Sequence, residues 1–178
     1  LRTGLAGLPE GQEGALGLSR DDRVVVVEEQ VAGFAWGLFY KIFDKIFRSD
    51  DVLVGAVEDG RALLEAADRL KPDLILLDIS MPLLNGLEAA RHLKKMLPET
   101  KLLFLTMHAS ARYATEAFKV GAQGFLLKQS AASELPQAIA ALMQGKHYLT
   151  PAIAKPVIDQ ALKSEETPTI KDGPEKLT

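Results

Sequence analysis

The segment of residues 74–86 constrains the fold of this chain more than any other segment. It opens with four consecutive aliphatic residues (74–77), a pattern typical of a strand that is buried on both faces of a parallel sheet. Asp78 follows directly, at the carboxyl edge of the sheet, where open α/β folds build their sites. A Met-Pro pair and an Asn-Gly pair then end the strand and turn the chain. A carboxylate in this position can bind a divalent cation or attack a phosphoryl group, but it can also simply cap a turn, and the segment alone favours neither reading.

The composition is that of an ordinary globular protein. Hydrophobic residues make up 47% and charged residues 25% of the 178 residues, which suits one domain with extensions. The absence of cysteine excludes disulfides, thiolate metal sites and cysteine nucleophiles, and it fits a reducing compartment. A net charge of −3 gives no basic surface for nucleic acid, and no stretch reaches the roughly 18 to 20 apolar residues of a membrane span. Because the start also lacks the features of a secretory signal, we expect a cytoplasmic protein with no membrane contact.

Strand-like and helix-like segments alternate from residue 23 onward. Apolar runs with the length of strands lie at 24–27, 52–57, 73–77, 101–106 and 123–127. Segments with helical spacing lie at 31–47, 60–70, 87–97, 110–120 and 133–144. This alternation predicts an α/β fold: a flavodoxin-like (βα)5 unit whose five-stranded parallel sheet has the order 2-1-3-4-5 and is covered by helices on both faces.

The two ends of the chain are predicted to extend beyond this unit. We expect an N-terminal extension at residues 1–20, the main domain at 21–146, and a linker helix with a flexible tail at 147–178. Thr150 and Pro151 suit the cap and the first turn of the linker helix. Within the domain, helix 31–47 carries two apolar stripes, so we expect the second stripe to contact the extension or another protomer, unless this stretch is not the helix that the fold requires.

Polar side chains stand at the ends of the other strands. Glu28 and Glu29 follow the first strand, Thr106 ends the fourth and Lys128 follows the fifth. In the predicted strand order the two acids would lie beside Asp78 and repel it unless a cation is bound, and hard oxygen ligands suit Mg²⁺ best. Each residue alone is most often a solvated strand end or a turn residue. Together they supply metal ligands, a nucleophile, a hydrogen-bond donor and a cation for the oxygens of a phosphoryl group.

Three stretches carry a family resemblance: Leu76-Leu77-Asp78-Ile79-Ser80-Met81-Pro82 with Asn85-Gly86, then Leu105-Thr106-Met107-His108, then Gly121-Ala122-Gln123-Gly124-Phe125-Leu126-Leu127-Lys128. In this order and spacing the chain resembles, from about residue 23 to 144, the receiver domain of bacterial two-component response regulators. The NarL/LuxR type is the subclass that it resembles most.

The resemblance implies roles for the residues of the site. Asp78 would accept a phosphoryl group from a sensor histidine kinase, Thr106 would hydrogen-bond the acyl phosphate, and Lys128 would pair with it. Phe125 stands where the family keeps an aromatic switch residue, which turns inward when Thr106 moves. Many receivers have a cis proline after this lysine; here Gln129 follows, and we expect a trans bond because a cis bond would cost roughly 3–4 kcal/mol.

The resemblance also implies Mg²⁺ as the cofactor. Glu28, Glu29 and Asp78 would supply carboxylate ligands, and Ser80 would add its backbone carbonyl. The family usually has aspartates at the first two positions, and the longer glutamate side chains crowd an octahedral site. We therefore expect weaker Mg²⁺ binding than is usual for the family. His108 is expected to be a loop residue near the mouth of the site rather than a ligand or a catalyst.

Three functions remain open at this point. The first is a phosphorylated switch, not an enzyme, that controls transcription: the end of the chain, Pro174-Glu175-Lys176-Leu177-Thr178, resembles the lead-in to a LuxR-type helix-turn-helix. DNA would then be bound only through that missing domain, and a homodimer through the output face is allowed. The second is a degenerate receiver that binds partners without phosphorylation, with a glutamate imitating the charged state. The third is an aspartyl-phosphate phosphatase; the haloacid dehalogenase-like enzymes have a second aspartate two residues after the first, where this chain has Ser80.

Overall fold

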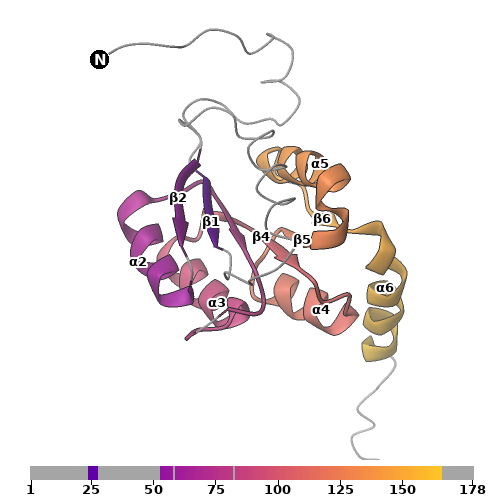
Figure 1. Ribbon diagram of the computed structural model, residues 1–178. Coiled ribbons are helices and arrows are strands. Elements are labelled where there is room, and N and C mark those ends of the chain that lie inside the picture. Colours follow the sequence, from indigo (N-terminus) through magenta and orange to yellow (C-terminus); the bar gives the residue numbers. More distant parts are fainter. Residues whose placement is uncertain (1–23, 28–52, 58, 82, 166–178) are drawn as a thin grey trace, which may run out of the picture.

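The computed structural model describes residues 24–27, 53–57, 59–81 and 83–165 (Figure 1). Several predictions made from the sequence fall outside this part of the chain, namely those for the extension 1–20, the acids Glu28 and Glu29, helix 31–47 and the tail after residue 165. The described elements are β1 (Val24–Val27), β2 (Leu53–Val57), α2 (Gly60–Leu70), β3 (Leu74–Leu77), α3 (Gly86–Met96), β4 (Lys101–Thr106), α4 (Ala111–Lys119), β5 (Gly124–Leu127), the 3₁₀ turn η1 (Lys128–Ser130), α5 (Ala131–Met143), β6 (Tyr148–Leu149) and α6 (Pro151–Glu165).

The predicted α/β fold with a parallel sheet is confirmed. The described strands pair in parallel in the order β2-β1-β3-β4-β5-β6. The prediction of five strands was wrong in one respect, because β6 adds a sixth strand beside β5. Two residues are too few to give a sequence pattern, and β6 is recognised only by its pairing of Tyr148 with Gly124 and Leu149 with Phe125.

Successive residues of β3 face opposite sides of the sheet, and both sides are buried. This explains why all four residues of β3 are apolar. Ile75 and Leu77 pack in one buried cluster with residues of α2, α3 and α4. Leu74 and Leu76 pack in a second buried cluster with residues of α5. Figure 1 shows α5 on the far side of the sheet from α2 and α3. Because both faces of β3 are covered, neither face can carry polar side chains, and the polar groups of this region are confined to the ends of the strands.

Local signals in the sequence set the boundaries of the helices. The side chain of Asp59 accepts hydrogen bonds from the backbone N–H groups of Arg61 and Ala62, at 2.8 and 2.9 Å, and so caps the start of α2. Lys71 ends α2 in a left-handed backbone conformation, directly before Pro72. These helix boundaries agree with the prediction because the residues that fix them are neighbours in the sequence.

Helix α6 lies where the sequence predicts a further helix after Thr150, and it packs against α4. It begins at Pro151, as expected, and lies against α4 (Figure 1). Ile153 is buried and Val157 is half-buried in the same apolar cluster that contains the α4 residues Ala114 and Ala117. None of the described helices has the length and apolar character needed to cross a membrane.

Candidate functional site

Asp78 is the first residue after β3 and is 7% exposed. Its backbone is held by the start of α3, where the N–H of Gly86 donates to the carbonyl oxygen of Ile79 at 2.9 Å. A Cβ atom on Gly86 would lie 2.0 Å from the carbonyl oxygen of Asp78, which is closer than atoms can approach. The Asn85-Gly86 pair therefore does more than turn the chain. Glycine lets α3 begin directly against the backbone of Asp78, and Asn85 caps that helix by accepting from the N–H of Glu88 at 2.9 Å.

Asp78 forms an ion pair with Lys128, which comes from the end of β5 two strands away. The Lys128 Nζ atom lies 2.8 Å from Asp78 Oδ2, and the two side chains are only 13% and 9% exposed. The other carboxylate oxygen, Oδ1, accepts from the backbone N–H of Ser80 at 3.2 Å. Water screens charges poorly at this depth, so the loss of either side chain would leave the other charge buried without its partner. A carboxylate has about four lone-pair positions, so these two donors leave room for a cation.

Thr106 and Phe125 are buried residues of the paired strands β4 and β5. Thr106 ends β4, is fully buried and pairs in register with Leu127, the residue before Lys128. Its Oγ1 atom accepts from the backbone N–H of His108 at 3.2 Å. Phe125 is fully buried as well, and its ring centroid lies 6.5 Å from that of Phe104. Thr106 thus ends its strand at the same edge of the sheet as Lys128, and the Phe125 side chain points into the core.

The loops after β3 and β4 touch through side chains. Ser80 Oγ and His108 Nε2 are 2.9 Å apart, and both residues are exposed. The His108 ring also lies 5.6 Å from the ring of Tyr113, at the start of α4. His108 is therefore a loop residue beside the site, as predicted. Its contact with Ser80 was not predicted, because two polar loop residues 28 positions apart give no local signal of pairing.

Two predictions about the site have different outcomes. The described residues contain no cis peptide bond, so the bond between Lys128 and Gln129 is trans, as predicted. Glu28 and Glu29 lie outside the described residues, and their position relative to Asp78 stays a prediction. Within the described part of the chain no three carboxylate, histidine or cysteine side chains gather into a metal site. Of the predicted Mg²⁺ ligands, the described ones are the carboxylate of Asp78 and the carbonyl of Ser80, both hard oxygen donors of the kind that Mg²⁺ prefers.

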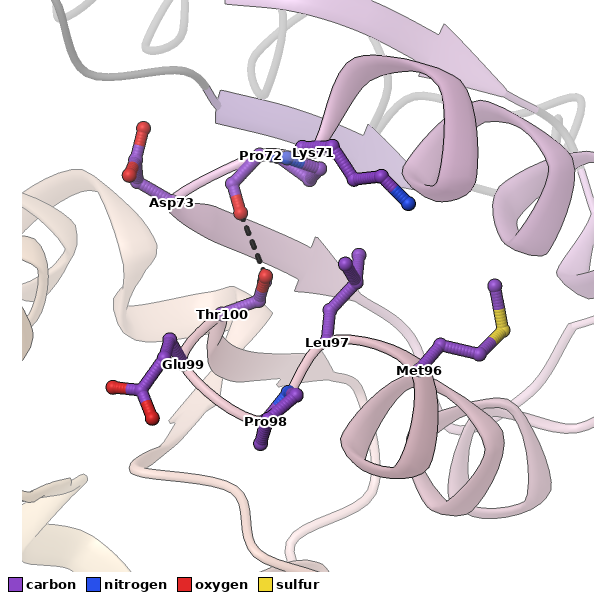
Figure 2. A pocket seen from close by; sticks show the side chains of 8 residues that line it. All are labelled: Lys71, Pro72, Asp73, Met96, Leu97, Pro98, Glu99 and Thr100. Carbon is purple, nitrogen blue, oxygen red and sulfur yellow. Dashed lines mark hydrogen bonds between the residues drawn. The ribbon is translucent and has the colours of Figure 1, made fainter.

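A hollow of about 250 Å³ lies at the opposite edge of the sheet, between the loops that precede β3 and β4 (Figure 2). The hydroxyl of Thr100 donates to the carbonyl oxygen of Pro72 at 2.7 Å and joins the two loops. The Nζ atom of Lys94 donates to the carbonyl oxygens of Thr100, at 2.7 Å, and of Pro98, at 3.2 Å. None of the predicted site residues lines this hollow, so it is separate from the Asp78 site.

Comparison with known proteins agrees with this geometry. The response regulator receiver domain family matches residues 37–140. DegU of Brevibacillus brevis, a transcriptional regulatory protein, is 39% identical over 103 residues, which cover 58% of this chain and 44% of DegU. The response regulator GacA of Pseudomonas viridiflava is 34% identical over 122 residues, which cover 68% of this chain and 55% of GacA. The chain thus spans about half the length of these relatives.

A solved structure shows the same fold. The crystal structure of a LuxR-family two-component response regulator from Aurantimonas sp. SI85-9A1 superposes with a TM-score of 0.69 at 26% identity, covering 79% of this chain and 97% of that one. The resemblance predicted from the motifs around Asp78, Thr106 and Lys128 is therefore confirmed at the level of the family. On the strength of the family match and of these relatives, the chain belongs to the response regulator receiver domain family, with relatives of the NarL/LuxR type.

Proposed function

We propose that this protein is the phosphoacceptor part of a two-component response regulator and that a sensor histidine kinase phosphorylates it on Asp78. The observation that carries the proposal is the buried ion pair between Asp78 Oδ2 and Lys128 Nζ at 2.8 Å. The Asp78 carboxylate is nearly enclosed and pairs with a side-chain cation, and a lysine side chain of this kind can pair with a phosphoryl group on the same carboxylate. The flavodoxin-like (βα)5 topology, with its sites at the carboxyl edge of the sheet, fits this role.

The reaction needs little covalent chemistry from the protein. An oxygen of Asp78 forms a bond to phosphorus while the phosphorus–nitrogen bond of the donor phosphohistidine breaks, and the nitrogen leaves with the electron pair. Lys128 then pairs with the phosphoryl oxygens, and the hydroxyl of Thr106 hydrogen-bonds another of them. Mg²⁺ would supply charge neutralisation for the transferred phosphoryl group when bound. Asp78 and Ser80 would hold it together with Glu28 and Glu29, and we expect the two glutamates to weaken its binding.

The signal would pass from the site to the rest of the molecule through Thr106 and Phe125. When Thr106 moves toward the phosphoryl group, the space it leaves lets the ring of Phe125 shift, and the face around α4 and α5 changes. We infer that this change controls transcription through a DNA-binding domain that follows the receiver in the full-length regulator, after the boundary predicted near residue 146 and the helix α6. RcsB, which is 25% identical, has been solved as two dimers bound to two parallel DNAs, and this supports a dimeric output.

Two alternatives give different outcomes in one experiment. A degenerate receiver would bind partners without accepting phosphate, and an aspartyl-phosphate phosphatase would turn over. The residue two positions after Asp78 argues against turnover, because Ser80 is a poor general acid. We expect the receiver itself to show no more than slow loss of its own phosphate.

The test is the intact mass of the protein after incubation with acetyl phosphate and Mg²⁺. We expect one added phosphoryl group on the wild type and none on Asp78→Asn. Asp73→Asn is the matched control, because Asp73 is a half-buried aspartate directly before β3, at the other end of the same strand. This variant should be phosphorylated normally.

An unmodified wild type at saturating Mg²⁺ would point to the degenerate receiver. Rapid release of inorganic phosphate would point to the phosphatase. A Mg²⁺ titration at the usual affinity of the family would contradict the expected weak binding.

A further inference from the structure

Thr150 is a fully buried polar residue with two hydrogen bonds to β5. Its backbone N–H donates to the carbonyl oxygen of Phe125 at 3.0 Å. Its hydroxyl oxygen accepts from the backbone N–H of Leu127, also at 3.0 Å. From the sequence Thr150 was expected only to start the linker helix, so its contact with β5 is an independent finding.

The Thr150 hydroxyl takes the place of the backbone carbonyl that a longer β6 would offer to the N–H of Leu127. Strand β6 ends at Leu149, so the backbone of this strand reaches only as far as Phe125 in the register. The N–H of Leu127 is buried and would lose its partner on this side without the side-chain oxygen of Thr150. Leu127 is the last residue of β5, and Lys128 follows it directly. The position of the backbone that carries Lys128 therefore depends on Thr150.

We propose that Thr150 is a positioning residue of the phosphoacceptor site: it fixes the end of β5 so that Lys128 meets Asp78, and it joins the start of α6 to the same strand. The first part follows from the contacts of Leu127 and from the Nζ–Oδ2 distance of 2.8 Å in the ion pair. The second part follows because the carbonyl oxygen of Thr150 accepts from the N–H of Ile153 at 3.1 Å, in the first turn of α6. This proposal rests on the proposed function of Asp78.

The consequence is a direct link from the site to α6. When Lys128 changes partner from the carboxylate to a phosphoryl group, the end of β5 adjusts, and Thr150 carries the adjustment to the first turn of α6. Ile153 and Val157 hold α6 in the apolar cluster with α4, so a shift at the first turn changes how the whole helix packs. The segment that leads out of the receiver would then respond to phosphorylation along this path as well as through Phe125.

The test compares Thr150→Val, which has nearly the same shape but no oxygen, with Thr150→Ser, which keeps the oxygen. Thr100→Val is the matched control, because it removes a buried hydroxyl that makes one hydrogen bond at the opposite edge of the sheet. The first readout is the rate constant of phosphorylation by acetyl phosphate at a temperature where all variants are folded. We expect Thr150→Val to be slower by a few-fold to about 100-fold, the range that misplacement of a reacting group produces. Thr150→Ser and Thr100→Val should keep the rate of the wild type.

A double variant separates positioning from a general loss of stability. In the Lys128→Met background, Thr150→Val should cause no further slowing, because the group that it positions is gone. Equal slowing in both backgrounds, or equal slowing by Thr150→Val and Thr100→Val, would overturn the proposal. A slow Thr150→Ser variant would overturn it too, and this variant decides the matter if Thr150→Val does not fold.

The second readout needs no phosphoryl donor and so separates this proposal from the proposed function. Amide hydrogen exchange of Leu127 and of residues 151–165 should be faster in Thr150→Val than in the wild type, and unchanged in Thr150→Ser and Thr100→Val. A wild type that accepts no phosphate refutes the role of Asp78, whereas normal exchange in Thr150→Val refutes the role of Thr150 whether or not phosphate is accepted.

Discussion

The two edges of the parallel sheet each contain a buried threonine and a lysine that is at least partly buried, yet they use them differently. At the amino edge, Thr100 and Lys94 donate to backbone carbonyl oxygens of the neighbouring loops. At the carboxyl edge, Lys128 pairs with the carboxylate of Asp78, and Thr150 accepts from the backbone at the end of β5. At the amino edge the two side chains hold neighbouring loops together, whereas at the carboxyl edge two opposite charges lie side by side.

This difference favours the carboxyl edge as the place of the proposed phosphorylation. The carbonyl oxygens that Lys94 and Thr100 bind belong to the backbone, so these bonds cannot break without changing the shape of the loops at the amino edge. Burial lowers the pKa of Lys94, against a smaller raising effect of Glu99. Side chains at the carboxyl edge can exchange partners without unfolding the strands that carry them.

The largest effect is expected from removing the two lysines in turn. Lys128→Met leaves the carboxylate of Asp78 buried without its cation, and breaking a buried pair in this way costs about 3–5 kcal/mol of the free energy of unfolding. Lys94→Met removes hydrogen bonds but leaves no unpaired charge, so we expect a loss of about 1.5 kcal/mol. Urea unfolding near neutral pH measures both. Adding Asp78→Asn to Lys128→Met should restore part of the loss, and an unchanged loss in the double variant would contradict this explanation.

A smaller effect is expected at the start of α3. Gly86→Ala places a methyl group against the carbonyl oxygen of Asp78 and should destabilise the protein by about 1–3 kcal/mol, with slower phosphorylation because Asp78 is displaced. Gly145→Ala is the control, since a Cβ there meets nothing within 4 Å and only the positive φ of +74° opposes it. Thermal unfolding and the rate of phosphorylation should change together in Gly86→Ala. If Gly145→Ala slowed phosphorylation equally, the close approach of α3 would not matter.

The third prediction concerns the amino edge alone. Thr100→Val removes the hydrogen bond to Pro72 and leaves a buried carbonyl oxygen unsatisfied, which costs about 1–3 kcal/mol of the free energy of unfolding. Phosphorylation of Asp78 should keep its normal rate, because the two edges share no polar contact among the described residues. Chemical denaturation and intact-mass kinetics on the same sample test this. A variant of normal stability would show that Thr100 does not hold the two loops together.

The smallest effect concerns pH. Burial, together with the hydrogen bond to Glu134 at 3.1 Å, raises the pKa of Tyr148 to about 12 from its ordinary value of 10. The folded protein therefore favours the neutral phenol. Its contribution to stability is complete below pH 10 and is lost as the pH rises through about 12. In Tyr148→Phe the free energy of unfolding should fall less steeply than in the wild type as the pH rises from 10 to about 12. Equal slopes for Tyr148→Phe and the wild type between pH 9 and 12 would contradict the shift.

The elements that the sequence predicted correctly share one property, namely that their signals are local. Helix α2 was placed at its observed residues from its helical spacing and from the Lys71-Pro72 pair that follows it, and β3 was recognised from its unbroken apolar run. The family resemblance rests on short motifs of the same kind. Strand β6 was missed because two residues have no periodicity. The contact between Ser80 and His108 was missed because it joins loops that are distant in the sequence.

The sequence by itself determined the alternation of strands and helices and the identity of the charged and hydroxyl residues that follow the strands. Hydrophobic periodicity and capping residues act within a few positions of one another, so these features can be read directly. Only the tertiary structure decided that Lys128 lies 2.8 Å from Asp78, that Gly86 is needed beneath it, and that Thr150 completes the end of β5. Gly86 approaches Asp78 across the loop between β3 and α3, whereas the contacts of Lys128 with Asp78 and of Thr150 with Leu127 join segments 50 and 23 positions apart. The pairing of the strands, rather than any local preference, brings these last two together.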